Sequence, residues 1–120
     1  MTKTSNLKQY DLEDRTLLFA KEVRTFLSKV PTKITNMDDV KQLIRSSGSV
    51  GANYIEANEA LSKKDFVHRI KICRKEAKET IYWLKLLSVE GKTVEDQRQK
   101  LQLESTELMK IFGSILRNSK

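Results

Sequence analysis

Hydrophobic residues recur along the chain at alternating steps of four and three, the spacing of one face of an α-helix. This pattern predicts helices over about residues 11–30, 38–58, 63–89 and 94–117, and no segment has the period of a strand. The stripes predicted to face the core are Leu12, Thr16, Phe19, Val23, Phe26 and Val30; Val40, Ile44, Ser47, Gly51, Tyr54 and Asn58, broadened by Leu43, Val50 and Ala57; Phe66, Ile70, Cys73, Ala77, Ile81, Leu84 and Leu87; and Leu101, Ser105, Leu108, Phe112 and Ile115, with Met109, Ile111 and Leu116 beside them.

The first two helices should be bounded by a proline and by a polar cap. Pro31 lacks a backbone N–H and disfavours helical geometry in the residue before it, so the first helix should end at Val30. Asn36 or Asp38 should cap the second helix, because short polar side chains accept the unpaired amide hydrogens of a first turn. Residues 31–36 are therefore predicted to form a loop.

The ends of the third and fourth helices have similar signals. Ser62 and Asp65 have the arrangement of a capping box at the start of the third helix. Gly91 suits the left-handed position that would end it. Thr93 is the expected cap of the fourth helix, with Asp96 three residues later.

The second predicted helix contains an unusual run of small residues, Ser46 to Ala52. Two glycines inside a helix cost roughly 0.8–1 kcal/mol each relative to alanine, so a loop is the alternative. The helical period continues through the run without a break, which favours a helix that another helix or subunit approaches closely. The residues predicted for such a contact are Ser47, Gly48, Gly51 and Ala52.

Short connections make successive helices antiparallel neighbours. We therefore expect an all-α, up-down-up-down antiparallel four-helix bundle. A chain of 120 residues fits one domain, 1–120, with flexible ends at about 1–10 and 118–120.

Composition adds a preference for acidic partners and an expected compartment. The net charge of +7 favours association with polyanions. Cys73 is the only cysteine, so no intramolecular disulfide can form and a reducing compartment is indicated. The polar first ten residues do not have the pattern of a signal peptide, and no apolar run has the roughly 18 residues of a membrane span. The expectation is a cytoplasmic protein without membrane contact.

The sequence indicates no catalytic or metal site. His68 is the only histidine and lies five residues from Cys73, so the two do not share a helix face, and a zinc site needs three or four ligands. Cys73 is expected to be a buried structural thiol. We expect Glu79 to pair with Lys75, and Glu76 to be solvated. The prediction is a non-enzymatic protein with no metal and no cofactor.

The third helix carries an outward row of basic residues. Most of its members lie two residues before a core position, about 200° around the helix. We call these residues the lysine row: Lys64, His68, Lys71, Lys75, Lys78, Tyr82 and Lys85. Lysines could contact phosphates and an aromatic ring could stack on a base; the alternative is a solvated face. The candidate nucleic-acid-binding residues are Lys64, Arg69, Lys71, Arg74, Lys75, Lys78, Tyr82 and Lys85.

Trp83 follows Tyr82 and lies off the centre of the core stripe. Aromatic residues beside a core edge are enriched at subunit interfaces. The alternative is that Trp83 widens the core face.

The second and third helices together resemble a known family. The residues concerned are Arg45-Ser46-Ser47-Gly48-Ser49-Val50-Gly51-Ala52-Asn53, Glu56-Ala57, Ser62, Asp65-Phe66, Lys71-Ile72, Lys75-Glu76-Ala77-Lys78-Glu79-Thr80 and Tyr82-Trp83-Leu84. They are similar to the bacterial four-helix-bundle family named for proteins encoded in 23S rRNA intervening sequences. Its relatives include the accessory variability proteins of diversity-generating retroelements.

The resemblance implies an up-down bundle that assembles into a homopentamer with a basic surface. In the retroelement branch, it implies binding to nucleic acid and to a reverse transcriptase. Together with the lysine row, this leads us to expect a non-enzymatic, homo-oligomeric interaction protein that binds RNA or DNA. The alternative is a structural or protein-binding adaptor with no nucleic-acid role.

Overall fold

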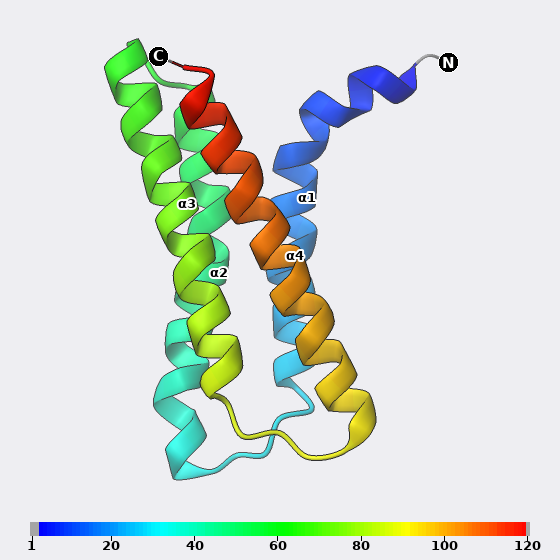
Figure 1. The fold of residues 1–120 in the computed structure, drawn as a ribbon. Coiled ribbons are helices and arrows are strands. Elements are labelled where there is room, and N and C mark those ends of the chain that lie inside the picture. Colours follow the sequence, from blue (N-terminus) through cyan, green and yellow to red (C-terminus); the bar gives the residue numbers. More distant parts are fainter. Residues whose placement is uncertain (1–2, 120) are drawn as a thin grey trace.

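Four helices contain most of residues 3–119, the part of the chain that the computed structural model describes; side chains are described from residue 12 onward. The helices are α1 (Lys3–Leu27), α2 (Ile34–Asn58), α3 (Lys63–Leu86) and α4 (Lys92–Arg117). Consecutive helices run antiparallel, and the first turns of α1 extend away from the other three helices (Figure 1). The predicted all-α four-helix bundle is confirmed.

Each helix packs against its two neighbours in the order α1, α2, α3, α4. The α2–α3 and α3–α4 contacts are the most extensive, and α4 returns to meet α1 over a smaller area. This arrangement leaves α3 in the middle of the best-packed part of the bundle. The outer face of α3 therefore belongs to the helix with the most extensive packing contacts.

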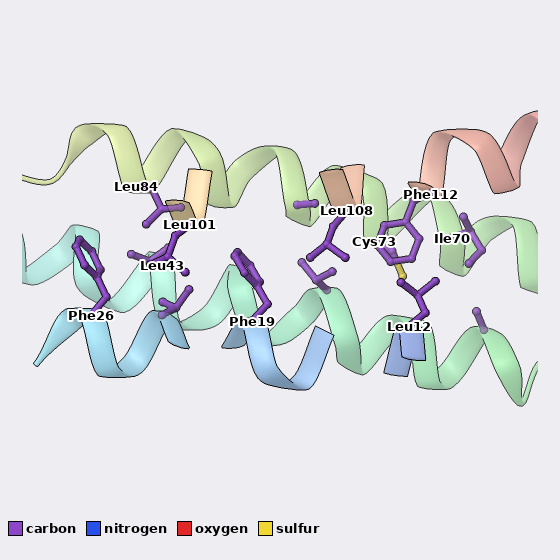
Figure 2. Close-up of a cluster of buried hydrophobic side chains, with 14 of the residues drawn as sticks. Leu12, Phe19, Phe26, Leu43, Ile70, Cys73, Leu84, Leu101, Leu108 and Phe112 are labelled. Atoms are coloured by element: carbon purple, nitrogen blue, oxygen red, sulfur yellow. The ribbon is translucent and has the colours of Figure 1, made fainter. Parts of the chain in front are cut away.

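The predicted stripes of α1, α3 and α4 meet along the bundle axis to form one core. On α2 the predicted stripe is partly wrong, because Ile44 and Asn58 are exposed and the core residues are the neighbouring Leu43, Val50 and Ala57. Figure 2 shows Phe19 and Phe26 of α1 pointing toward Leu43, Leu84 and Leu101. Further along the bundle, Cys73 of α3 and Phe112 of α4 belong to the same core cluster (Figure 2). The buried hydrophobic residues are Leu12, Phe19, Val23, Phe26, Leu43, Val50, Ala57, Ile70, Cys73, Ala77, Leu84, Leu87, Leu101, Leu108 and Phe112.

Two predicted ends around the first loop are wrong. α1 ends at Leu27 and not at Val30, and α2 begins at Ile34, before both predicted caps. Lys33 occupies the cap position of α2 and makes no side-chain cap bond. The first helical turn therefore includes Asn36, whose side chain has partners elsewhere.

Asn36 ties together the two loops at one end of the bundle (Figure 1). Its Nδ2 donates to the Pro31 carbonyl at 3.2 Å and to the Ser88 carbonyl at 3.1 Å, and its Oδ1 accepts from the Ser88 amide at 3.1 Å. Because Asn36 is buried, these three bonds satisfy polar groups that water cannot reach. The side chain that we expected to cap α2 instead holds the α1–α2 loop against the α3–α4 loop.

The start of α3 follows the sequence signal and the start of α4 does not. The Ser62 hydroxyl accepts the Asp65 amide hydrogen at 3.0 Å, which confirms the predicted cap of α3. Gly91 has a positive φ of 94°, which favours glycine, but its ψ of 144° is not that of the expected left-handed helical position, and it precedes α4 instead of ending α3. Thr93 therefore lies inside the first turn of α4 and is not its cap.

An arginine from α4 replaces the expected glycine at the end of α3. α3 ends at Leu86, and the carbonyls of a last helical turn need partners from outside the helix. Arg98 supplies them, because its Nη1 donates to three carbonyls, most closely to that of Leu87 at 2.6 Å. Arg98 also pairs with Glu95, and the pKa of the Glu95 carboxyl is lowered because it accepts hydrogen bonds from Arg98 and Gln99.

The chain ends were expected to be flexible over residues 1–10 and 118–120. Residues 3–10 form the start of α1, so the helix begins well before the predicted Asp11. At the other end, the Asn118 and Ser119 amides bond back to the Ser114 and Leu116 carbonyls. Residues 1, 2 and 120 lie outside the described residues.

Candidate nucleic-acid interface

The lysine row lies on the outer face of α3, as its spacing predicts. All seven members are exposed, and Tyr82 as a whole residue is 58% exposed. From Lys64 to Lys85 the row follows the helix for about 30 Å, at 1.5 Å per residue. Its five lysines are therefore presented along one straight edge of the bundle.

The carboxylates of α3 beside the row are held largely by α2. Nη2 of Arg45 lies 3.2 Å from Oε1 of Glu76 and 3.1 Å from Oε1 of Glu79. The prediction that Glu76 is solvated is wrong, since this residue is only 5% exposed, and the prediction of a Lys75–Glu79 pair is replaced by the Arg45 pair. Within the row, Lys75 alone has an ion-pair contact, with its Nζ 3.9 Å from Oε2 of Glu76.

The two candidate arginines of α3 lie outside the row, one on the side of α2 and the other on the side of α4. Arg69 is partly buried on the α2 side, where its Nη1 donates to Oδ1 of Asn53 at 3.0 Å. Arg74 is exposed on the α4 side, with its Nε near Gly113. Arg69 is therefore engaged in holding α2 to α3, whereas Arg74 remains available for a ligand.

Arg74 lines an open groove between α3 and α4. The groove has a volume of about 340 Å³. We call it the α3/α4 groove, and its lining residues are Val67, Lys71, Arg74, Gly113, Leu116, Arg117 and Ser119. Lys71 belongs both to this groove and to the lysine row, so the two basic surfaces are continuous.

The small residues of α2 form a close contact with α1. A Cβ atom on Gly51 would lie 2.8 Å from Oγ1 and 3.1 Å from Cβ of Thr16, so the two helices meet there without room for a side chain. Ser47 is buried one turn earlier, whereas a Cβ on Gly48 would come no closer than 3.9 Å to Arg24. Gly51 therefore packs inside the chain and is not free for another subunit.

An apolar groove runs beside this contact. Its volume is about 490 Å³, and we call it the α1/α2 groove. The exposed Ala52 lines it, together with Leu17 and Ile55, which are 54% and 50% exposed. The α2 patch thus has two parts: Gly51 against α1, and Ala52 open to the outside.

Trp83 packs on the edge of the core while Tyr82 faces outward. Their rings meet edge to face, with centroids 5.0 Å apart and an interplanar angle of 77°. Trp83 is partly buried against the core cluster, which agrees with the interpretation that it widens the core face. Its buried Nε1 has no hydrogen-bond partner among the described residues.

The remaining candidate chemistry is structural. Cys73 is fully buried, and burial raises the pKa of its thiol to about 12, so it is held as an unreactive thiol. Among residues 12–119, no three His, Cys, Asp or Glu side chains gather where they could hold a metal ion. Over the described residues, no helix is both long enough and apolar enough to cross a lipid bilayer.

Sequence reasoning missed two residues that shape this surface. Arg45 enters the sequence analysis only among the residues that resemble the family, because its pairing with Glu76 and Glu79 crosses between helices that no intrahelical spacing links. Arg117 was placed near the fraying end of the chain. Gly113 lies one turn before it on α4, but the approach of Arg74 to the same point depends on the position of α4 against α3.

The comparisons with known proteins agree with this fold. The sequence profile of the 23S rRNA-intervening sequence protein family matches residues 8–114. A crystal structure of a protein of unknown function from the S23 ribosomal protein family of Bacteroides thetaiotaomicron is similar, with a TM-score of 0.74 and 34% sequence identity. The similarity covers 87% of this chain and 96% of that chain. The comparison with curated proteins finds no match.

Proposed function

The chain belongs to the 23S rRNA-intervening sequence protein family, and from that premise we propose a function. We propose that the protein is a non-enzymatic, homo-oligomeric interaction protein. It binds RNA or DNA through the lysine row. The single observation that supports the proposal is the separation of charge on α3. Five exposed lysines follow one face, while Glu76 and Glu79 are drawn toward Arg45 of α2. A face arranged in this way keeps its positive potential.

The dimensions of the row suit a nucleic-acid backbone. About 30 Å of helix corresponds to roughly nine base pairs of duplex, at 3.4 Å per phosphate on one strand. Tyr82 stands near the end of the row with more than half of its surface exposed, where its ring could stack on an unpaired base. Lysines act as point charges without a fixed base preference, so the expected binding is to backbone and is not specific for sequence.

Charge reversal within the row tests the proposal. The variant Lys75→Glu with Lys78→Glu should weaken binding to a labelled duplex and lower the magnitude of the salt slope by about 2, measured by fluorescence anisotropy. The matched control is Lys41→Glu with Lys110→Glu, which makes the same change of net charge on α2 and α4, outside the row and outside both grooves. Equal losses in the two double variants would show that only net charge matters, and would remove the row from the proposal.

The assembly part of the proposal is supported by the α1/α2 groove. Exposed apolar side chains grouped on one side of a small protein are typical of a subunit contact. The substitution Leu17→Glu with Ile55→Glu places charge in the groove without touching the core, so it should dissociate the oligomer while leaving helical content unchanged. Light scattering measures the mass, and an unchanged mass would exclude this face.

The competing function is a structural or protein-binding adaptor, with a reverse transcriptase among the partners that the family resemblance suggests. The observation that favours it is the same exposed apolar groove, lined by Leu17 and Ile55. The two functions differ in how binding responds to salt, because phosphate contacts weaken as salt rises and apolar contacts do not. They also differ in the residues that binding needs. An adaptor that binds through the groove should lose its partner in Leu17→Glu and keep it in Lys75→Glu with Lys78→Glu.

A further inference from the structure

The α3/α4 groove gathers positive charge, and its described lining includes no carboxylate side chain. Lys71, Arg74 and Arg117 line it, and no Asp or Glu is among its lining residues. Within residues 12–119, none of these three side chains makes an ion pair or a side-chain hydrogen bond. By contrast, Arg15, Arg45 and Arg98 elsewhere on the molecule each form an ion pair with a glutamate.

The two arginines converge on one point. A Cβ atom on Gly113 would lie 3.7 Å from Nη1 of Arg117 and 3.9 Å from Nε of Arg74. The two guanidinium groups are therefore within about 8 Å of each other, which is no more than a Debye length at physiological salt. Like charges at that separation repel unless an anion lies between or beside them.

Gly113 forms part of the groove surface beneath these arginines. It is buried in the interior of α4, where glycine costs helix stability relative to alanine. Close packing does not require a glycine here, because a Cβ would meet its neighbours only at ordinary van der Waals distances. A glycine at this position leaves the groove open between the two guanidinium groups.

From this geometry we propose that the α3/α4 groove binds a phosphate group through Arg74, Arg117 and Lys71. Guanidinium groups donate paired hydrogen bonds to phosphate oxygens, and a lysine adds a point charge. The proposal deepens the proposed function, because Lys71 joins the groove to the lysine row. The phosphate can come from the backbone of a nucleic acid or from the end of a strand.

The first test uses inorganic phosphate alone. Sodium phosphate replaces sodium chloride at constant ionic strength while TROSY spectra of the full ¹⁵N-labelled chain are recorded. The Gly113 amide should shift and saturate, and the other three glycines, Gly48, Gly51 and Gly91, are internal controls. In Arg117→Gln the shift should disappear, and in Lys110→Gln, which removes an exposed charge of α4 outside the groove, it should persist. A Gly113 amide that moves no more than the other glycines would overturn the proposal.

The second test uses a single-stranded oligonucleotide with a 5′-phosphate or a 5′-hydroxyl. Arg117→Gln should weaken binding about five- to tenfold more than Lys110→Gln, the loss expected for one phosphate contact near 0.1 M salt. A preference for the 5′-phosphate that Arg117→Gln abolishes identifies a strand end as the ligand. Equal binding of both oligonucleotides with the same loss identifies the backbone. Equal losses in Arg117→Gln and Lys110→Gln would overturn the proposal.

A variant that fills the groove guards against a folding artefact. Gly113→Ala should leave the melting temperature unchanged or raised, yet weaken phosphate binding at least twofold.

The experiments distinguish failure of the groove proposal from failure of the proposed function. If charge reversal in the row abolishes oligonucleotide binding while Arg117→Gln does not weaken it, the groove is wrong and the proposed function stands. If the oligonucleotide does not bind but phosphate shifts Gly113 in an Arg117-dependent way, the groove stands and the proposed function falls.

Discussion

Gly51 is the position where one added methyl group should reveal how tightly α1 and α2 are packed. In Gly51→Ala the new Cβ would lie 2.8 Å from Oγ1 and 3.1 Å from Cβ of Thr16. Thr16 cannot rotate away easily, because it is buried, β-branched, and donates its hydroxyl hydrogen to carbonyls of its own helix. The clash must therefore be relieved by a shift of the helices.

The magnitude follows from two opposing effects. Replacing a helical glycine by alanine gains about 0.8–1 kcal/mol from helix propensity. Overpacking costs about 1–3 kcal/mol. The net expectation for Gly51→Ala is a loss of up to about 2 kcal/mol. Gly48→Ala is the matched control in the same helix, and it should gain up to about 1 kcal/mol, because its nearest neighbour would be Arg24 at 3.9 Å.

Urea unfolding followed by circular dichroism, at one protein concentration for all variants, measures this difference. Gly51→Ala should be about 1–3 kcal/mol less stable than Gly48→Ala, or roughly 4 °C in melting temperature per kcal/mol. The double variant with Thr16→Ala should recover part of the loss, which a double-mutant cycle quantifies. Equal stability of the two alanine variants would refute the close contact.

Three further substitutions or measurements probe the interior. Asn36→Asp places a carboxylate against two loop carbonyls and should cost about 2–3 kcal/mol in thermal or urea unfolding at neutral pH; an unchanged midpoint would exclude its role in joining the loops. Arg45→Met leaves the buried Glu76 with only the longer Lys75 contact and should cost about 1–3 kcal/mol, whereas Lys41→Met at an exposed position should be neutral. The Cys73 thiol, with a folded-state pKa of about 12 against an ordinary 9.0, contributes stability that is complete below pH 9 and is lost as the pH rises toward 12. At pH 8 it should react with a thiol reagent only after unfolding, and fast labelling of the native protein would contradict its burial.

The number and order of the helices and the core faces of α1, α3 and α4 could be predicted, because each stripe is set by the local period of the sequence. The centre of the α2 stripe was predicted one residue away from the buried Leu43, because the run of small residues weakens the contrast between its faces. Phe19, Cys73 and Phe112 are buried where that period places them. Helix ends depended on distant partners and were predicted less well. Asn36 is a residue type typical of helix caps, but its side chain bonds instead to the backbone of Ser88, 52 residues away.

The outward position of the lysine row could also be predicted, because exposure follows from the same period as burial. The ion pairs of the acidic residues beside the row could not be predicted. Whether Glu76 neutralises the row or turns toward α2 depends on where Arg45 stands, and that requires the packing of two helices to be known. The groove around Gly113 likewise arises only when α3 and α4 are brought together.

Binding of the unmodified protein to a structured rRNA fragment and to duplex DNA across a salt series tests the central claim most directly, with the assembly state measured by light scattering in the same buffer. If the five lysines of the row all reach phosphates, the logarithm of the duplex association constant should fall with log salt at a slope of about −4 to −5. The protein should remain oligomeric throughout. Absence of binding even at low salt, or a slope near zero, would contradict a nucleic-acid role for the row and leave the adaptor function in its place.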